Sequence, residues 1–231
     1  MLQPRENELY FYSFNHPTQP VIKTLPADLL AAESMVLEAL KTSLKDQPLG
    51  RWEVTLKFEG LKLMPLAIRL MQNLQEEGFE LVLVWPDMGG AALAKHNAPD
   101  LANQISSLKD LLAKQNGNDD DRIFLVVAPQ PTDYEQFELL CNKHSGAVVM
   151  LNGRLEDSAV GIGGVARQRR RGFLSLWRKA YWLEPLESGA LMRSHPGEWI
   201  LFRADVDGYR ETTTFDQRPD AEAIDAAFFG T

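Results

Sequence analysis

The chain has 231 residues, of which 45% are hydrophobic and 24% are charged, a composition typical of a globular protein with a sizeable core. Its 24 basic and 32 acidic side chains give a net charge of −8, which argues against a general nucleic-acid binder. The single cysteine, Cys141, excludes an intrachain disulfide, and no stretch reaches the roughly 18 apolar residues of a membrane span. Because the first residues also lack the apolar segment of a signal peptide, we expect a cytoplasmic protein.

The first third of the chain predicts an arm, a helix and a strand. Residues 1–24 combine three prolines with four aromatic side chains, and we expect this N-terminal arm to lie against the body, which residues 25–231 form as one domain. Apolar residues at spacings of three and four predict a helix over residues 29–44. Strict alternation over residues 52–59 predicts a strand with one buried and one solvent-exposed face.

The middle of the chain alternates between helical patterns and apolar runs. Helical spacing recurs over residues 66–74, 101–112 and 134–141, and the segments that lie between these helices or follow them are almost continuously apolar, at residues 79–85, 123–128 and 147–151. Strands that are apolar on both faces are typical of a covered parallel sheet. We therefore expect βαβ units with right-handed crossovers.

After residue 180 the pattern changes to short extended runs, at residues 181–186, 191–193, 198–204 and 209–215. Ser-Gly, Pro-Gly and Asp-Gly pairs separate them, and these pairs favour tight turns. A helical pattern follows over residues 219–228. The predicted fold class is therefore α/β, with a mostly parallel central sheet covered by helices, an antiparallel C-terminal meander and a closing helix.

The basic residues are concentrated in one segment. Between Ser158 and Leu183 the sequence has no acid but six basic side chains. If residues 164–180 form one helix, Arg167, Arg171 and Arg178 share a stripe opposite an apolar face. Three interpretations are open: a solvated face paired with nearby acids, a site for an anion or acidic partner, or contact with an anionic membrane. The candidate partner- or anion-binding residues are Arg154, Gly161, Gly163, Gly164, Arg167, Arg170, Arg171 and Arg178.

Arg169 lies on the apolar face of the same predicted helix, where an unpaired guanidinium group would be costly to bury. We therefore expect a carboxylate from another element to hold it, and the nearest candidates along the meander are Glu184, Glu198 and Asp205. Replacing Arg169 should then destabilise the fold, whereas replacing Arg171 on the exposed stripe should not.

A second candidate site lies where predicted core strands end. Asp87, Asn152 and Asp157 follow such strands, and ligands bind at this edge of open α/β sheets. Asp87, Arg154 and Arg167 are hypothesised to line one crevice there, and the alternative for Asp87 is a helix N-cap. The four histidines are scattered and no catalytic motif is present, so we assign no catalytic residue, metal ligand or cofactor.

Several motifs together resemble a domain-of-unknown-function family of cyanobacteria and chloroplasts. The resemblance spans residues 24–229, and the segments that carry it are 85–87, 150–157, 161–163, 167–177, 181, 184–186, 189–191, 195–199, 218–219 and 224–225. That family includes the low photosystem II accumulation 3 type of plastid assembly factor and a domain appended to a chloroplast adenylate kinase.

The resemblance implies a non-enzymatic factor for photosystem II assembly or maintenance, on the cytoplasmic side of thylakoid membranes. Its partner would be an acidic protein surface or an anionic thylakoid lipid, bound through the basic helix. The alternative is an α/β domain that binds a nucleotide or another phosphorylated metabolite near Asp87 and residues 161–164. Nucleic acid is not expected as a partner.

Overall fold

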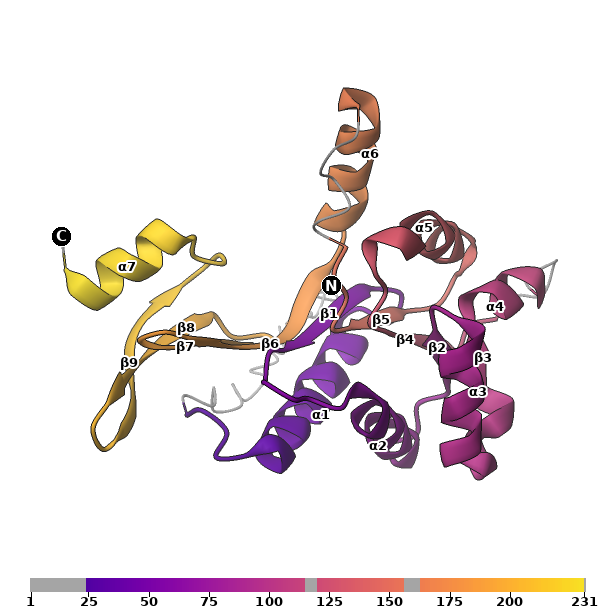
Figure 1. The fold of residues 1–231 in the computed structure, drawn as a ribbon, viewed down its shortest axis with the longest axis horizontal. Helices are drawn as coiled ribbons and strands as arrows, with labels where there is room; N and C mark the ends of the chain where they lie inside the picture. The colour runs from indigo at the N-terminus through magenta and orange to yellow at the C-terminus, as the bar shows by residue number, and fades with distance from the viewer. Residues whose placement is uncertain (1–23, 115–119, 156–162, 231) are drawn as a thin grey trace, which may run out of the picture.

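A computed structural model describes residues 24–114, 120–155 and 163–230, which form one nine-stranded sheet with helices on both faces (Figure 1). The strand order is β3-β2-β4-β5-β1-β6-β7-β8-β9. Strands β3 to β6 pair in parallel, and β6 to β9 pair antiparallel. The predicted fold class is confirmed. The predicted N-terminal arm lies outside the described residues, apart from Thr24.

The parallel half contains five strands, which are β1 (Arg51–Leu56), β2 (Leu81–Trp85), β3 (Ile105–Ser107), β4 (Ile123–Val127) and β5 (Val148–Leu151). Its helices are α1 (Leu29–Asp46), α2 (Leu63–Glu76), α3 (Met88–Asn97), α4 (Leu108–Lys114) and α5 (Tyr134–Lys143), with short 3₁₀ helices at Pro99–Gln104 and Pro131–Asp133. Strands β2, β4 and β5 are buried along their whole length, as their continuous apolar runs predict.

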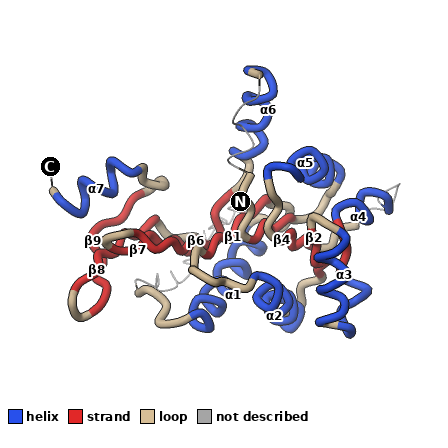
Figure 2. Tube along the Cα trace, viewed as in Figure 1, coloured by secondary structure: helices blue, strands red, loops and turns tan. Residues whose placement is uncertain are grey.

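The helices form two layers (Figures 1 and 2). Helices α1, α2 and α3 pack on one face of the sheet in the largest hydrophobic cluster, and α4 and α5 pack on the other face in a second cluster. This division follows from right-handed crossovers, because the chain moves along the sheet in one direction from β1 to β3 and in the other from β3 to β5.

The C-terminal half is the predicted meander, made of β6 (Arg178–Leu186), β7 (Gly189–Ser194), β8 (Trp199–Asp205) and β9 (Gly208–Phe215), followed by α7 (Ala221–Phe229). Strand β6 joins the two halves, since it pairs in parallel with β1 and antiparallel with β7. Helix α7 packs on one face of the meander through Ile224 and Phe228, against a cluster of two tryptophans and two leucines.

Strand β1 corrects the sequence prediction. Its alternation predicted a solvent-exposed face, yet every residue of β1 except Arg51 is buried, including Glu53 and Thr55. The reason is position, because β1 lies at the centre of the sheet between β5 and β6 and Lys179 of β6 forms an ion pair with Glu53. A buried strand can therefore carry alternating polar residues when its neighbours supply their partners.

Candidate functional site

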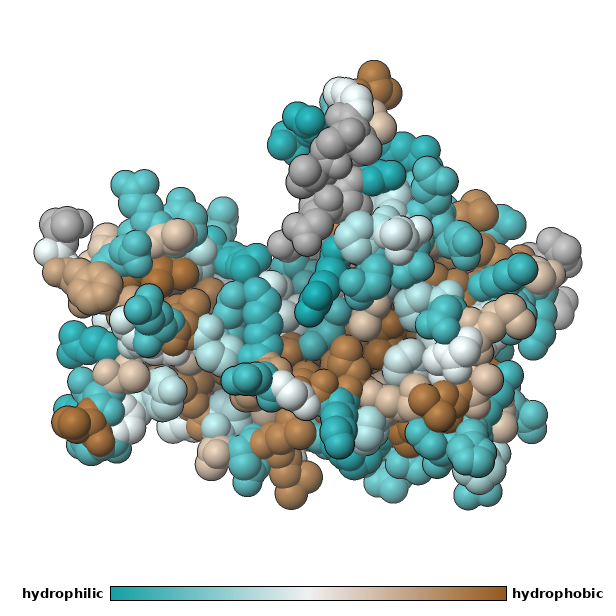
Figure 3. Space-filling view, viewed as in Figure 1, coloured by the Kyte–Doolittle hydropathy of each residue, from teal (hydrophilic) through white to brown (hydrophobic). Residues whose placement is uncertain are grey.

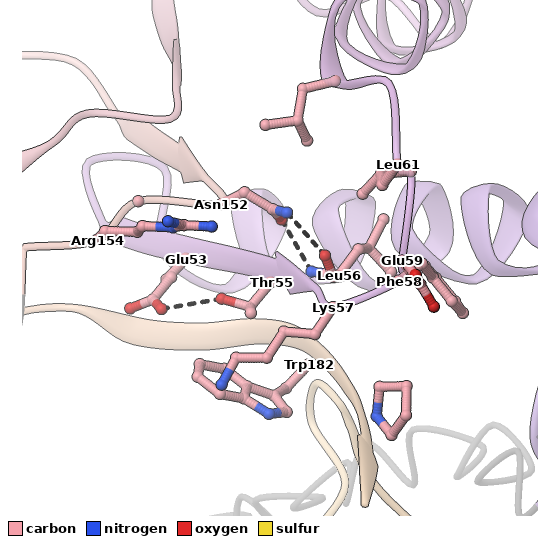
Figure 4. A pocket seen from close by; sticks show the side chains of 13 residues that line it. Glu53, Thr55, Leu56, Lys57, Phe58, Glu59, Leu61, Asn152, Arg154 and Trp182 are labelled. Carbon is pink, nitrogen blue, oxygen red and sulfur yellow. Dashed lines mark hydrogen bonds between the residues drawn. The ribbon is translucent and has the colours of Figure 1, made fainter.

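A groove with a volume of about 770 Å³ lies at the carboxyl ends of β1 and β5 (Figure 4). The chain leaves β1 towards α2 and leaves β5 towards helix α6 (Gly164–Ser175), and these helices pack into clusters on opposite faces of the sheet. In open α/β sheets, ligands bind in the crevice that such diverging connections create. The groove is lined by Glu53, Thr55, Leu56, Lys57, Phe58, Glu59, Leu61, Leu63, Asn152, Gly153, Arg154, Trp182 and Pro185.

Asn152 shapes the groove by joining its two strands. Its side-chain oxygen accepts a hydrogen bond of 2.8 Å from the backbone N–H of Leu56, and its side-chain nitrogen donates one of 2.7 Å to the Leu56 carbonyl oxygen. The backbone of Asn152 has φ = 52°, a left-handed conformation that asparagine adopts more readily than most residues. The predicted site residue Asn152 therefore lines the groove, while its amide extends the pairing between β5 and β1.

Arg154 is the second predicted residue in the groove. Its backbone N–H donates to the carbonyl oxygen of Pro129 over 2.9 Å, which fixes the start of its side chain. The side chain is exposed, and Figure 4 shows its guanidinium group pointing into the groove. Among the residues that the structure describes, none forms an ion pair with Arg154.

Glu53 supplies a buried carboxylate to the wall of the groove. One of its oxygens accepts a hydrogen bond of 3.0 Å from the hydroxyl of Thr55, and the other is bound by the ammonium group of Lys179. Glu53 is 5% exposed, so these two partners offset the cost of removing the carboxylate from water. The carboxylate is thereby held in one orientation beside the groove (Figure 4).

Three cations surround the indole ring of Trp182 next to the groove. The nitrogen of Lys57 lies 5.1 Å from the ring centroid, that of Lys179 5.4 Å and the guanidinium carbon of Arg218 4.2 Å, all within cation–π range. Glu184 neutralises part of this charge, since it forms ion pairs with Lys57 over 2.6 Å and with Arg218 over 3.4 Å.

Glu184 also accepts a hydrogen bond of 2.9 Å from the indole N–H of Trp182. Burial alone would raise the pKa of Glu184, but the hydrogen bonds from Lys57 and Trp182 outweigh this effect and lower the pKa below its ordinary value. Glu184 therefore stays ionised and holds the cations around the ring.

The basic helix α6 stands out from the body of the molecule (Figure 1), with strongly hydrophilic side chains beside it (Figure 3). Its last turn contacts α5 through Phe173, which lies edge-on to Phe137 at 6.0 Å between ring centroids. Val165, at the other end of the helix, is 86% exposed. Helix α6 is thus attached at its C-terminal end and exposed over its first turns.

The helix is shorter than the sequence predicted. It ends at Ser175, and Trp177 turns into the core before β6 begins at Arg178. Arg178 is therefore a strand residue opposite Trp52 of β1, and the single helical stripe of Arg167, Arg171 and Arg178 is wrong. The physical reason is that strand pairing and burial of Trp177 stabilise the extended conformation more than one further helical turn would.

Arg169 has the kind of partner that its position predicted, but not the predicted residue. Its side chain donates to buried Glu138 of α5, with 3.1 Å between Nε and Oε1, whereas Glu184, Glu198 and Asp205 were expected. The expected burial is also wrong, because the Arg169 side chain is 70% exposed and that of Glu138 only 6%. Since α6 stands away from the meander and its last turn packs on α5, the acid comes from α5.

The other predicted residues are placed as follows. Arg167 and Arg171 are exposed on α6, Arg170 lies 4.5 Å above the ring of Tyr134, and Gly163 and Gly164 form the start of the helix. Asp87 is the N-cap of α3, where its carboxylate accepts from the N–H of Gly90 over 2.8 Å. Neither Asp87 nor Arg167 lines the groove, and Gly161 and Asp157 lie outside the described residues.

Sequence reasoning missed Glu53, Lys57 and Trp182 as residues of the groove. Glu53 and Lys57 belonged to the alternating pattern that was interpreted as a solvated face, and Trp182 was taken as a meander residue. The available signal was the spacing of polar residues along β1, because alternate residues of one strand project from the same face.

Within the described ranges, no group of three or more histidine, cysteine, aspartate or glutamate side chains is placed to hold a metal ion. Cys141 is buried, and burial raises the pKa of its thiol to about 12. No helix in this same part of the chain is long and apolar enough to cross a membrane.

The fold and the groove define an open, mostly parallel α/β domain with an antiparallel extension. Residues 26–226 match the family described as "Domain of unknown function (DUF1995)", and the chain therefore belongs to that family. No curated protein is significantly similar to the chain.

Proposed function

We propose that this protein is a non-enzymatic assembly or maintenance factor that docks on an acidic protein or lipid surface through the exposed arginines of α6 and the start of β6. The observation that carries the proposal is the placement of these arginines. Arg171 and Arg178 are exposed, and no ion pair with either is present among the described residues. Such cations keep their charge available for a partner.

The surroundings of α6 support this role. Residues 163–183 contain no acid, in a chain whose net charge is −8. The helix is tied to α5 through Phe173 and Arg169, so its first turn extends beyond the body with Arg167 exposed, and Arg171 is exposed between the two attachment residues. A charged helix held at one end presents its side chains to a partner without moving the core.

The resemblance noted from the sequence suggests where this partner lies. It implies a factor for photosystem II at the cytoplasmic side of thylakoid membranes, where an acidic subunit or an anionic lipid would face α6. Accumulation of photosystem II in a strain that lacks the protein tests this setting. Normal accumulation in that strain would contradict the biological part of the proposal.

Co-sedimentation with isolated thylakoid membranes tests the docking surface. Binding should weaken as salt is raised, because exposed charges are screened beyond about 8 Å at physiological ionic strength. Changing Arg167, Arg171 and Arg178 together to alanine should remove most of the binding. The matched control changes Lys62, Lys95 and Arg203, three exposed cations on other elements, and should bind as the unchanged protein does. Equal binding by both triple variants would contradict the proposal.

A further inference from the structure

We propose that the groove at the carboxyl ends of β1 and β5 binds a small phosphorylated metabolite that carries sugar hydroxyl groups. Its volume of about 770 Å³ falls within the range of roughly 300–1,000 Å³ that is typical of small-molecule sites. Its position between two diverging connections is where ligands bind in open α/β sheets. The chemistry of its walls narrows the class of ligand.

Arg154 provides the site for a phosphate group. A guanidinium group presents five N–H donors in a planar fork that matches the oxygens of a phosphate. The Arg154 side chain points into the groove, and none of the described acids neutralises it. Lys57, which directly follows β1, adds a second cation, and its side chain remains 47% exposed despite its ion pair with Glu184. Arg154 and Lys57 therefore offer two cations to an anionic group in the groove, which Glu59 also lines.

Glu53 provides the site for hydroxyl groups. An ionised carboxylate offers about four acceptor positions, and the contacts with Thr55 and Lys179 occupy one position on each oxygen. The oxygens therefore retain acceptor capacity on the wall of the groove. A fixed carboxylate close to a phosphate-binding arginine suits a ligand with hydroxyl groups a few bonds away from its phosphate, as in a sugar phosphate or a nucleotide.

Apart from Glu59, the remaining wall is mostly apolar. Phe58 and Leu61 come from the connection between β1 and α2, Leu63 begins α2, and Pro185 comes from β6. These side chains give the carbon skeleton of a ligand a surface to contact while its phosphate and hydroxyl groups face Arg154 and Glu53. A metal ion would suit the groove poorly, because Lys179 already neutralises Glu53 and two further cations face the same space.

Isothermal titration with ribose 5-phosphate, adenosine monophosphate, adenosine and inorganic phosphate tests the proposal. We expect the two phosphorylated sugars to bind at least about 10-fold more tightly than adenosine, which lacks the phosphate, and than inorganic phosphate, which lacks the hydroxyl groups. Absence of binding by both phosphorylated sugars would overturn the proposal. Equal affinity for ribose 5-phosphate and inorganic phosphate would overturn the role of Glu53 and with it the ligand class.

Variants locate the binding in the groove and separate this proposal from the docking role of α6. Arg154→Met should weaken ribose 5-phosphate at least about 10-fold, whereas Arg171→Met, an exposed arginine of α6, should leave it unchanged. Unaltered affinity of Arg154→Met would overturn the site.

Thr55→Val removes the hydroxyl that orients Glu53 and keeps the Lys179 ion pair. It should weaken ribose 5-phosphate more than inorganic phosphate, and an equal effect on both would contradict the role of Glu53.

Discussion

Two groups of cations in this molecule have opposite surroundings. Around Trp182, the charges of Lys57, Lys179 and Arg218 lie over one indole ring and pair with acids. On α6, Arg167 and Arg171 are exposed on a helix without acids. The first group packs the junction between the two halves of the sheet, and the second faces solvent.

The difference shows what decides which cations are structural. It is the presence of an acidic side chain beside the cation, and not the density of basic residues in the sequence. Glu53 reaches Lys179 from a position 126 residues earlier in the chain. Arg169 illustrates the point within the basic segment, because Glu138 binds it while Arg171, two residues later, has no ion pair in the described part of the chain. Charge density along the sequence therefore locates a basic surface but does not tell a paired arginine such as Arg169 from Arg171.

The largest expected effect comes from breaking the ion pair at the junction. In Lys179→Met, the carboxylate of Glu53 stays buried with the Thr55 hydroxyl as its remaining hydrogen-bond partner among the described residues. Removing one member of a buried ion pair costs about 3–5 kcal/mol. Since Lys179 is itself partly exposed, we expect the free energy of unfolding to fall by about 3 kcal/mol, measured by urea denaturation.

A double variant provides the control for this prediction. In Glu53→Leu/Lys179→Met both charges are replaced by apolar side chains, which is often neutral for a buried ion pair. Most of the lost stability should return. If the double variant is less stable than Lys179→Met alone, the loss comes from packing around Trp182 and not from an unpaired carboxylate.

Much of the fold could be predicted from the sequence because its signals are local. The apolar residues that form β2, β4 and β5 are continuous in the sequence, so they predict buried strands. Glycine-containing pairs mark the hairpins between the strands of the meander. These patterns depend on residues close together in the chain. Strand order and the choice of partner for each charge depend on contacts between distant residues, and the sequence alone left them open.

The residues of the candidate site divide in the same way, into those that local patterns predicted and those that depend on contacts between distant residues. Asn152 and Arg154 were predicted because ligands bind where parallel strands end, and both line the groove. Glu53 was missed because a strand with alternating polar residues normally has one solvent-exposed face. In the structure that face is covered, and the partner of Glu53 is Lys179 of β6, which is distant in the sequence. The end of α6 was misplaced because burial of Trp177 and pairing with β1 override the helical pattern of residues 176–180.

A buried histidine extends the comparison to a basic side chain that is packed against an aromatic ring. His144 is 5% exposed and stacks on Phe124, with 3.6 Å between the ring centroids. Burial, and secondarily the guanidinium group of Arg51, lowers its pKa below the ordinary 6.5. The unfolded chain therefore takes up a proton near pH 6.5 that the folded protein excludes, so this contribution to stability is present above pH 6.5 and is lost as the pH falls.

Urea denaturation at several pH values measures this effect. Below pH 6.5 the free energy of unfolding should decrease by at most about 1.4 kcal/mol per pH unit from this one proton. His144→Leu keeps an apolar side chain against Phe124 and should reduce the slope between pH 6.5 and 5. An unchanged slope would assign the pH dependence to other groups.

A variant of Arg169 tests whether this side chain attaches α6 to α5 without contributing much to the stability of the core. In Arg169→Met, the carboxylate of Glu138 keeps the hydroxyl of Tyr134, which donates over 3.1 Å and stays protonated because burial and Glu138 raise the pKa of Tyr134 to about 12. We expect a smaller loss of global stability than for Lys179→Met, together with faster hydrogen exchange in α6. Unchanged exchange in α6 would mean that Phe173 and Trp177 attach the helix without Arg169.

The smallest expected change in stability comes from replacing Arg171. This variant tests the comparison between the two groups of cations most directly. Arg171→Met removes an exposed cation that has no ion pair in the described part of the chain, so the free energy of unfolding should change by no more than about 0.5 kcal/mol. Both Arg171→Met and Lys179→Met replace one basic side chain by the same apolar one, and the two positions lie eight residues apart in the sequence. A difference of at least about 2 kcal/mol between them would therefore report the buried partner and not the lost charge. If Arg171→Met were as destabilising as Lys179→Met, α6 would have to be held by its arginines, and its exposed face would be structural instead of a docking surface.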